Sequence, residues 1–378
     1  MNNRKNILKV LLISALTLTI SACTSPKTGD NNLSDTVTPA DNISGTSGSG
    51  VNADASNEGT GSTNDESSSQ DASGDLNVTD ATEDDGTNAS ASAATSTTIY
   101  KDPISNSEPV KDGYLNIVFL GDEQFLTGTS EGNTIPDLMH NRFDDPTVYN
   151  LAIKDTMGAI PRSQTSTDPS AYTEPGFTAM AHVLAGDINI SAFGDKVSQE
   201  VATTCSKVNV KTVDYYVIGY GYHDYYNGVE ASNENNPEDE HSLHGAIVTG
   251  IKILQKVSPD AHFIICSPYY CRFYDDKGND IGDAYSVTKG LTTLAVYANE
   301  TVLAADDVTN AIAFPAISGT LFDLNGHTYG QYLESDGLTM NIKARRIYSD
   351  ALARIIKYHL GFIGQEEAYQ TITIADYN

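Results

Sequence analysis

A run of apolar residues that ends abruptly in Gly-Asp is the feature that most constrains the fold of this chain. The run covers residues 115–120 (LNIVFL), and Gly121, Asp122 and Glu123 follow it directly. Such a run is typical of a buried strand, and a tight exit places polar side chains at the carboxyl end of a sheet. Because ligands of open α/β sheets bind outside the carboxyl ends of the strands, we expect Asp122 and Glu123 to lie at a functional site.

Further short apolar runs alternate with segments of helical periodicity. The runs predict strands at residues 148–153, 213–219, 261–266 and 311–314. The intervening segments predict helices at residues 177–185, 243–257, 284–305 and 342–358. Strands that alternate with helices of this length indicate an α/β fold, in which a mostly parallel sheet is covered on both faces as a three-layer α/β/α sandwich.

The first 22 residues are typical of a secretory signal. Basic residues precede an apolar segment (10–20) that is shorter than the ~20 residues a membrane span needs. Residues 20–23 (ISAC) resemble the bacterial lipobox, which implies cleavage before Cys23 and lipid attachment to its thiol. We therefore expect an exported protein, lipid-anchored to the outer face of the bacterial cell membrane. An ordinary signal peptide followed by an incidental cysteine is the alternative.

Residues 23–98 differ in composition from the rest of the chain. Ser, Thr, Gly, Asn and Asp dominate this segment, it has no aromatic residue, and Lys27 is its single basic residue. Such a segment buries too little apolar surface to offset its conformational entropy, so we expect a disordered acidic linker. Residues 99–378 remain for one folded domain. The formal net charge of −28 argues against nucleic acid as a partner.

Three polar loops lie where strands end or helices begin: residues 121–123 (GDE), 221–224 (GYHD) and 336–341 (DGLTMN). In a parallel sheet such loops can converge on one crevice. Their order and spacing resemble the SGNH/GDSL hydrolase superfamily, whose members are mostly esterases, lipases and carbohydrate deacetylases. The resemblance implies a flavodoxin-like α/β/α fold and acyl chemistry through a serine nucleophile.

The chain departs from the motifs of that family at the positions that carry the chemistry. Glu123 stands where the serine nucleophile would be, His223 replaces the oxyanion-hole asparagine, and Thr339 replaces the general-base histidine. The family's second motif contains a glycine, which should follow the strand that contains Asn150. The residues nearest to that position are Lys154 and, with a shifted loop, Gly158. The candidate site residues at the motif positions are Asp122, Glu123, His223, Asp224, Asp336 and Thr339.

These replacements predict the loss of serine esterase activity. A carboxylate at position 123 has no proton to give up, and a threonine at position 339 is no base near neutral pH. Losing the nucleophile and the base together removes a unit worth on the order of 10⁶ in rate. Ser130 and Ser335 are the nearest candidates for a displaced nucleophile by sequence.

Other interpretations of the same residues stay open. The carboxylates and His223 could recruit a cation, or two carboxylates could hydrolyse a glycan by flanking the scissile bond. Asp122 and Asp336 could instead simply cap the helices that follow them. His241 and His244 beside an acidic loop could form a surface metal site. Alternatively, they are ordinary polar residues at the start of a helix and bind nothing. We predict no cofactor and no resident metal.

Tyrosines cluster past the strand at residues 213–219. Rings with a hydroxyl suit stacking on sugars, although tyrosines that merely cover the sheet end would give the same pattern. The candidate ligand-binding residues are Tyr220, Tyr222, Tyr225, Tyr226 and Lys154. The sequence thus favours a cell-surface lipoprotein that binds a glycan or cell-wall ligand in a degenerate crevice. The alternative is an active hydrolase, either an SGNH-type esterase or deacetylase or a carboxylate-based glycan hydrolase.

Three cysteines lie in the predicted folded domain. Cys266 and Cys271 are close enough in sequence to form a small disulfide loop, which would leave Cys205 unpaired. The spacing matches no zinc pattern.

Overall fold

The computed structural model describes residues 115–166 and 168–377. The predicted signal segment, Cys23 and the acidic linker lie outside the described residues. Five parallel strands form the central sheet in the order β2-β1-β3-β4-β9. Their bounds are β1 (Asn116–Gly121), β2 (Thr147–Asn150), β3 (Tyr215–Gly219), β4 (His262–Cys266) and β9 (Ala311–Phe314). The predicted α/β class with a mostly parallel sheet is confirmed.

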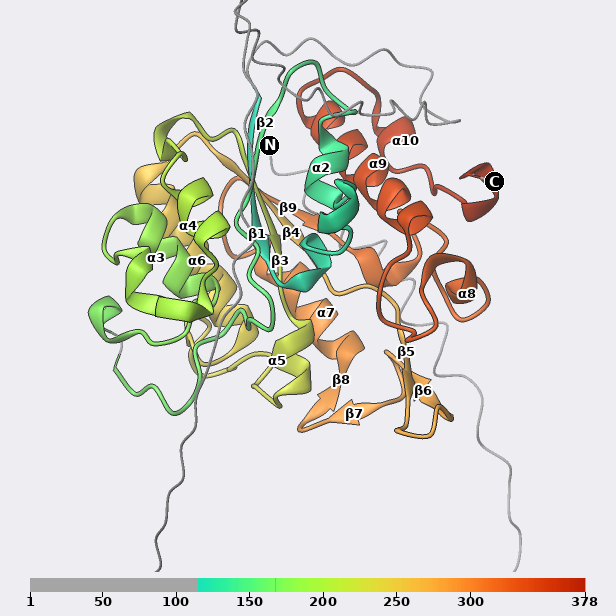
Figure 1. Ribbon diagram of the computed structural model, residues 1–378, viewed down its shortest axis with the longest axis horizontal. Helices are drawn as coiled ribbons and strands as arrows, with labels where there is room; N and C mark the ends of the chain where they lie inside the picture. The colour runs from blue at the N-terminus through green and yellow to red at the C-terminus, as the bar shows by residue number, and fades with distance from the viewer. Residues whose placement is uncertain (1–114, 167, 378) are drawn as a thin grey trace, which may run out of the picture. The chain divides into compact units, whose positions relative to one another are not determined.

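Helices cover both faces of the sheet, which gives the expected three layers. In Figure 1, α3, α4 and α6 lie on one side of the sheet, and α2, α9 and α10 lie on the other. The α-helices are α2 (Ile135–Met139), α3 (Phe177–Ala185), α4 (Gln199–Cys205), α5 (Tyr222–Tyr226), α6 (Leu243–Val257), α7 (Leu294–Ala304), α8 (Tyr329–Tyr332), α9 (Ile342–His359) and α10 (Gln365–Ala368). The 3₁₀ helices are η1 (Glu123–Phe125), η2 (Thr129–Glu131), η3 (Pro169–Ala171), η4 (Ile190–Lys196), η5 (Val210–Thr212), η6 (Ala316–Ser318) and η7 (Ile374–Tyr377).

The central strands end level with one another. Gly121 of β1 pairs with Gly219 of β3, which in turn pairs with Cys266 of β4. The ring of Phe125 packs over both glycines, and a Cβ at either position would lie 2.7 Å from a ring atom. This close packing holds η1 against the end of the sheet. Because β1 and β3 are paired to their last residues, the loops that follow them leave the sheet side by side, and the candidate site lies there.

One predicted helix is shorter than expected. The sequence predicts a helix over residues 284–305, but α7 begins only at Leu294. The preceding residues form a small antiparallel ribbon, β7 (Thr288–Lys289) with β8 (Thr292–Thr293). β-Branched threonines favour strands, and Gly290, with φ of 57°, makes the turn between them. A second ribbon pairs β5 (Arg272–Tyr274) with β6 (Asp280–Asp283).

The cysteines do not form the proposed disulfide. Cys205, Cys266 and Cys271 are all free thiols in the described part of the chain. The thiol of Cys266 is buried, hydrogen-bonds with Tyr348, and has its pKa raised by burial to about 12. It is thus a core side chain. Within residues 115–166 and 168–377, no helix combines the length and the apolar character that crossing a membrane requires.

Candidate functional site at the carboxyl edge of the sheet

The turn after β1 brings two acidic side chains to the sheet edge. Asp122 is the N-cap of η1, and its Oδ1 accepts a hydrogen bond from the backbone N–H of Gln124 at 3.1 Å. Glu123 is the first residue of η1, and its side chain is partly exposed. The capping role considered for Asp122 is confirmed, whereas α9 is capped by Asn341 rather than by Asp336.

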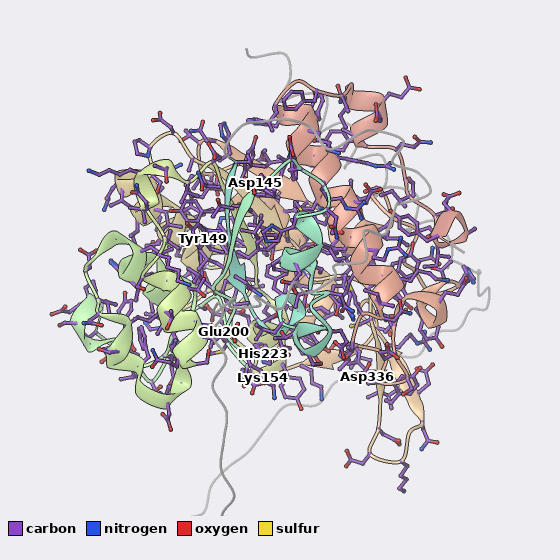
Figure 2. All side chains as sticks on the ribbon, turned by 45° about the horizontal axis from the view of Figure 1, so that its top comes forward. Asp145, Tyr149, Lys154, Glu200, His223 and Asp336 are labelled. Carbon is purple, nitrogen blue, oxygen red and sulfur yellow. The ribbon has the colours of Figure 1, made fainter. Side chains whose placement is uncertain are left out.

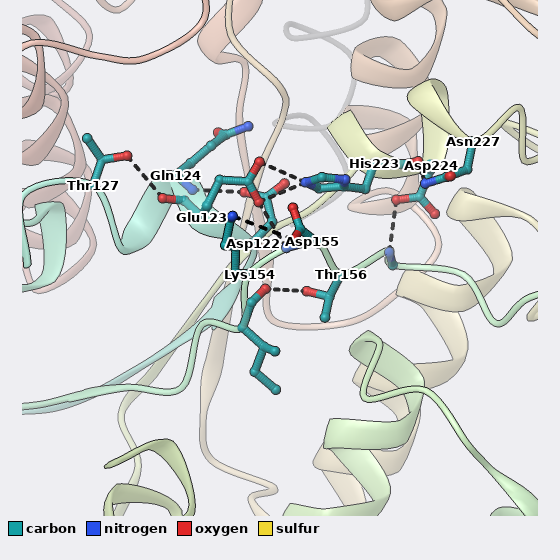
Figure 3. A network of polar contacts seen from close by, with 12 residues as sticks. Asp122, Glu123, Gln124, Thr127, Lys154, Asp155, Thr156, His223, Asp224 and Asn227 are labelled. Atoms are coloured by element: carbon teal, nitrogen blue, oxygen red, sulfur yellow. Dashed lines mark hydrogen bonds and ion pairs between the residues drawn. The ribbon is translucent and has the colours of Figure 1, made fainter. Parts of the chain in front are cut away.

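Glu123 and His223 form an ion pair across the gap between the loops of β1 and β3 (Figure 3). Nε2 of His223 lies 2.8 Å from Oε1 and 2.7 Å from Oε2 of Glu123. Burial opposes both charges. The hydrogen bond and the opposite charge nevertheless outweigh it, so the pKa of Glu123 is lowered and the pKa of His223 is raised. Two motif positions that the sequence predicted to converge are therefore in direct contact.

A backbone N–H from the loop after β2 completes the surroundings of Glu123. Asp155 donates its N–H to Oε2 of Glu123 at 3.2 Å. Asp155 has a φ of 60°, a conformation that glycine adopts most readily. The N–H that reaches Glu123 from this loop thus belongs to Asp155 and to neither of the two residues considered from the sequence, Lys154 and Gly158. Sequence reasoning missed Asp155 because its residue type does not signal a left-handed backbone.

Asp122 is buried beneath this pair. Its side chain is 0% exposed, and Oδ2 has no hydrogen-bond partner among the described residues. Burial, reinforced by the negative charge of Glu123, raises the pKa of Asp122 to about 8. Ligand atoms of Asp122, Glu123 and His223 all lie within 4.8 Å of one another. The three side chains therefore form one compact cluster with a single buried, unpaired oxygen.

The side chain of Asp224 holds a neighbouring loop in place. It is fully buried, and its two carboxylate oxygens accept N–H bonds from Gly158 at 2.8 Å and from Ala159 at 2.9 Å. Burial raises its pKa to about 6 although both hydrogen bonds favour the charged form. Asp224 fixes the loop of residues 158–159 against α5, so it is no free acid or base at the edge of the sheet.

Asp336 and Thr339 form a separate local turn. Asp336 accepts hydrogen bonds from the N–H groups of Leu338 and Thr339 and from the Thr339 hydroxyl. Within the described residues, neither side chain has a hydrogen bond or ion pair to Glu123 or His223. Figure 2 draws Asp336 apart from His223. The third motif frame therefore forms a turn of its own beside the Glu123–His223 pair.

The predicted tyrosine group divides into core and surface residues. Tyr220 is 2% exposed and Tyr225 is 0% exposed, so the prediction that they bind a ligand is corrected: their rings pack in the core. Tyr222 is half-buried, and Tyr226 is 55% exposed. The rings of Tyr222 and Tyr226 stack with centroids 6.3 Å apart. α5 turns every 3.6 residues, which places Tyr225 on its buried face and Tyr226 outside.

Lys154 lies at the rim of a cavity that is separate from the Glu123–His223 pair. Its side chain is exposed, with Nζ 3.7 Å from Oδ2 of Asp155. It also borders a cavity of about 320 Å³ beside β2, which Leu126, Asn150 and Glu200 line with it. Figure 2 marks Lys154 and Glu200 near the same end of the sheet. The cavity does not include Glu123 or His223.

Comparison with known proteins finds similarity at the level of structure. No family model and no curated protein matches the chain. A solved structure described as a possible lipase from Chitinophaga pinensis is 14% identical, covers 66% of this chain and 100% of its own, and has a TM-score of 0.42. A carbohydrate esterase family 2 enzyme with a carbohydrate binding domain, from Corynascus thermopiles (Myceliophthora fergusii), is 17% identical over 68% of each chain, with a TM-score of 0.36.

A salicylyl-acyltransferase from a tetracycline biosynthetic pathway is 14% identical, covers 68% of this chain and 56% of its own, and has a TM-score of 0.37. The titles of these proteins name a lipase, an esterase and an acyltransferase. At these identities and TM-scores the chemistry of the present chain is decided by its own residues.

Proposed function

We propose that this chain is a cell-surface lipoprotein whose SGNH-like domain has no serine esterase activity and binds a glycan or cell-wall ligand at the carboxyl edge of its sheet. A lipid attached to Cys23 anchors the chain to the membrane. One observation carries the loss of activity. The carboxylate of Glu123 accepts hydrogen bonds from His223 and from the N–H of Asp155.

His223 stands at the position that the resemblance gives to the oxyanion-hole asparagine, and the N–H of Asp155 binds the same carboxylate. Here a negative charge of the protein already engages them, so a substrate oxyanion would have to compete with a fixed carboxylate. The serine position itself offers no hydroxyl. The general-base position holds Thr339, whose hydroxyl is hydrogen-bonded to Asp336. Nucleophile, base and oxyanion site are thus all altered together.

The carboxylate-pair alternative has less support in the geometry. Glycoside hydrolysis requires both carboxyl groups to reach the scissile bond. Asp122 is fully buried, so of the adjacent pair Asp122 and Glu123 only the Glu123 side chain, which is 34% exposed, is open to a substrate. Ser130 and Ser335, the candidates for a displaced nucleophile, are both exposed. Neither has a histidine partner among the described residues.

Ligand binding is supported by the surface of α5. Tyr226 is exposed, stacks on Tyr222, and lies under the ammonium group of Lys289, which is 5.2 Å from its ring centroid. Tyr222 in turn contacts the imidazole of His223 edge-on. A rigid aromatic pair beside a cationic group offers an apolar face and polar handles, which is the chemistry that sugar rings recognise.

The binding proposal is tested with the full chain on purified peptidoglycan and on xylan. Tyr226→Ala should weaken saturable binding roughly 2–10-fold, since an aromatic contact is worth about 0.5–1.5 kcal/mol. Tyr285→Ala is the matched control, because Tyr285 is 53% exposed but lies on the turn after β6. No saturable binding, or an equal loss in both variants, would refute the glycan site.

A further inference from the structure

We propose that Asp122, Glu123 and His223 together bind one divalent transition-metal cation of the Zn²⁺ or Mn²⁺ class. This proposal goes beyond ligand binding at the tyrosines and differs from the prediction, made from sequence, that no metal is resident. Two carboxylate oxygens and one imidazole nitrogen are donors that both ions accept. Their ligand atoms already lie within 4.8 Å of one another, so small side-chain rotations would bring all three to one ion.

The second observation is the unpaired oxygen of Asp122. A buried carboxylate oxygen without a partner is costly, and native proteins pair such groups with donors or with cations. Oδ2 of Asp122 has no partner among the described residues, and the side chain is 0% exposed. An ion between Asp122 and Glu123 would satisfy this oxygen and offset the negative charge of both carboxylates.

Backbone donors hold each carboxylate in a fitting orientation. The N–H of Gln124 binds Oδ1 of Asp122, which leaves Oδ2 for an ion. The N–H of Asp155 binds Oε2 of Glu123, which leaves Oε1 available once the histidine turns its nitrogen to the ion. Such outer contacts orient metal ligands in established sites. Two carboxylates with a neutral imidazole balance a dication, and the partly exposed Glu123 gives it a path of entry.

A second histidine in this chain shows why the arrangement matters. His244 also has two acidic neighbours, but Glu300 lies 3.4 Å from Nδ1 and Asp307 lies 3.0 Å from Nε2. The two carboxylates therefore lie on opposite sides of the ring and cannot hold one ion with it. At His223, by contrast, both oxygens of Glu123 face the same nitrogen. His244 is thus the matched negative control.

The test measures metal bound to the full, tag-free chain after chelator treatment and reloading with Zn²⁺, and the absorption of the Co²⁺ form. We expect one tightly held ion per chain and a visible Co²⁺ ligand-field band. Asp122→Asn and His223→Gln should each lower Zn²⁺ affinity by at least 10-fold, whereas His244→Gln should leave it unchanged. Circular dichroism verifies that each variant is folded.

Asp122→Asn decides the matter if His223→Gln does not fold, because the amide keeps the size of the side chain and the acceptor for Gln124. Less than one ion per chain at micromolar free Zn²⁺ would overturn the proposal. Unchanged affinity in Asp122→Asn would overturn it as well, since the ion would then be bound elsewhere, for example by the acidic segment of residues 23–98.

Discussion

Residue 123 decides what the carboxyl edge of this sheet can do. Its carboxylate pairs with His223 and accepts a hydrogen bond from the N–H of Asp155. The acidic residues at this edge are not equivalent, although the fold brings them close together. Glu123 is partly open to solvent, whereas Asp122 and Asp224 are fully buried. Which of these carboxylates a ligand can reach is therefore set by burial.

Asp224 should prove to be a stabilising residue. Asp224→Ala would leave the N–H groups of Gly158 and Ala159 without their acceptor, at a cost of about 1–3 kcal/mol for each buried donor. We expect the urea midpoint of unfolding to fall strongly, while Asp260→Ala, at an exposed turn, should change it little. Equal midpoints for the two variants would show that Asp224 has no such structural role.

At the scale of elements, the two glycines that end β1 and β3 let the Phe125 ring close over the sheet edge. Gly219→Ala places a Cβ 2.7 Å from two atoms of that ring, so either the ring or η1 must shift. Overpacking of this kind typically costs about 1–3 kcal/mol. Thermal unfolding should therefore begin at a lower temperature than in the wild type.

Gly330→Ala provides the comparison, because a Cβ at position 330 meets nothing within 4 Å. This variant should match or slightly exceed the wild type in stability, since alanine favours a helix over glycine. If Gly219→Ala proved as stable as Gly330→Ala, the close packing of Phe125 over the sheet edge would be wrong.

His244 should make the stability of the α6–α7 pair depend on pH. Its contact with Glu300 raises its pKa, burial opposes the rise, and Asp307 adds to it. A folded-state pKa above the unfolded one means that the stabilisation is complete below about pH 6.5, the usual pKa of histidine, and is lost as pH rises through the folded value. The contribution should stay below about 1 kcal/mol, because Asp307 is exposed to solvent.

The measurement is the free energy of unfolding between pH 5 and 9 for the wild type and for His244→Gln. The difference between them should shrink as pH rises. A constant difference across this range would mean that the pKa of His244 is the same in the folded and the unfolded protein.

At the scale of the whole domain, the sequence predicted the sheet better than the site. Short apolar runs located all five strands of the sheet. In β1, β3 and β4 burial on both faces leaves a continuous apolar signal, whereas the edge strands β2 and β9 are only partly buried. The ribbon of β7 and β8 was missed because two-residue strands carry almost no periodicity. Glu123 and His223 were predicted to converge and do so.

The rest of the site depends on contacts that sequence spacing does not encode. Asp155 was missed because its left-handed backbone is set by the surrounding fold and not by its residue type. Tyr220 and Tyr225 were predicted to bind a ligand because they follow the strand in sequence. Their position in the sequence does not reveal that other parts of the fold bury both rings. Burial of a loop residue is a property of the assembled layers.

The central claim is that this domain does not hydrolyse esters through a serine nucleophile. An assay of ester turnover tests it most directly. The full chain is assayed on p-nitrophenyl acetate and on acetylated xylan, beside Glu123→Ala and Asp336→Ala. We predict no turnover above a heat-denatured sample in any of the three proteins. Turnover by the wild type that survives repurification and disappears in Glu123→Ala or Asp336→Ala would contradict the account.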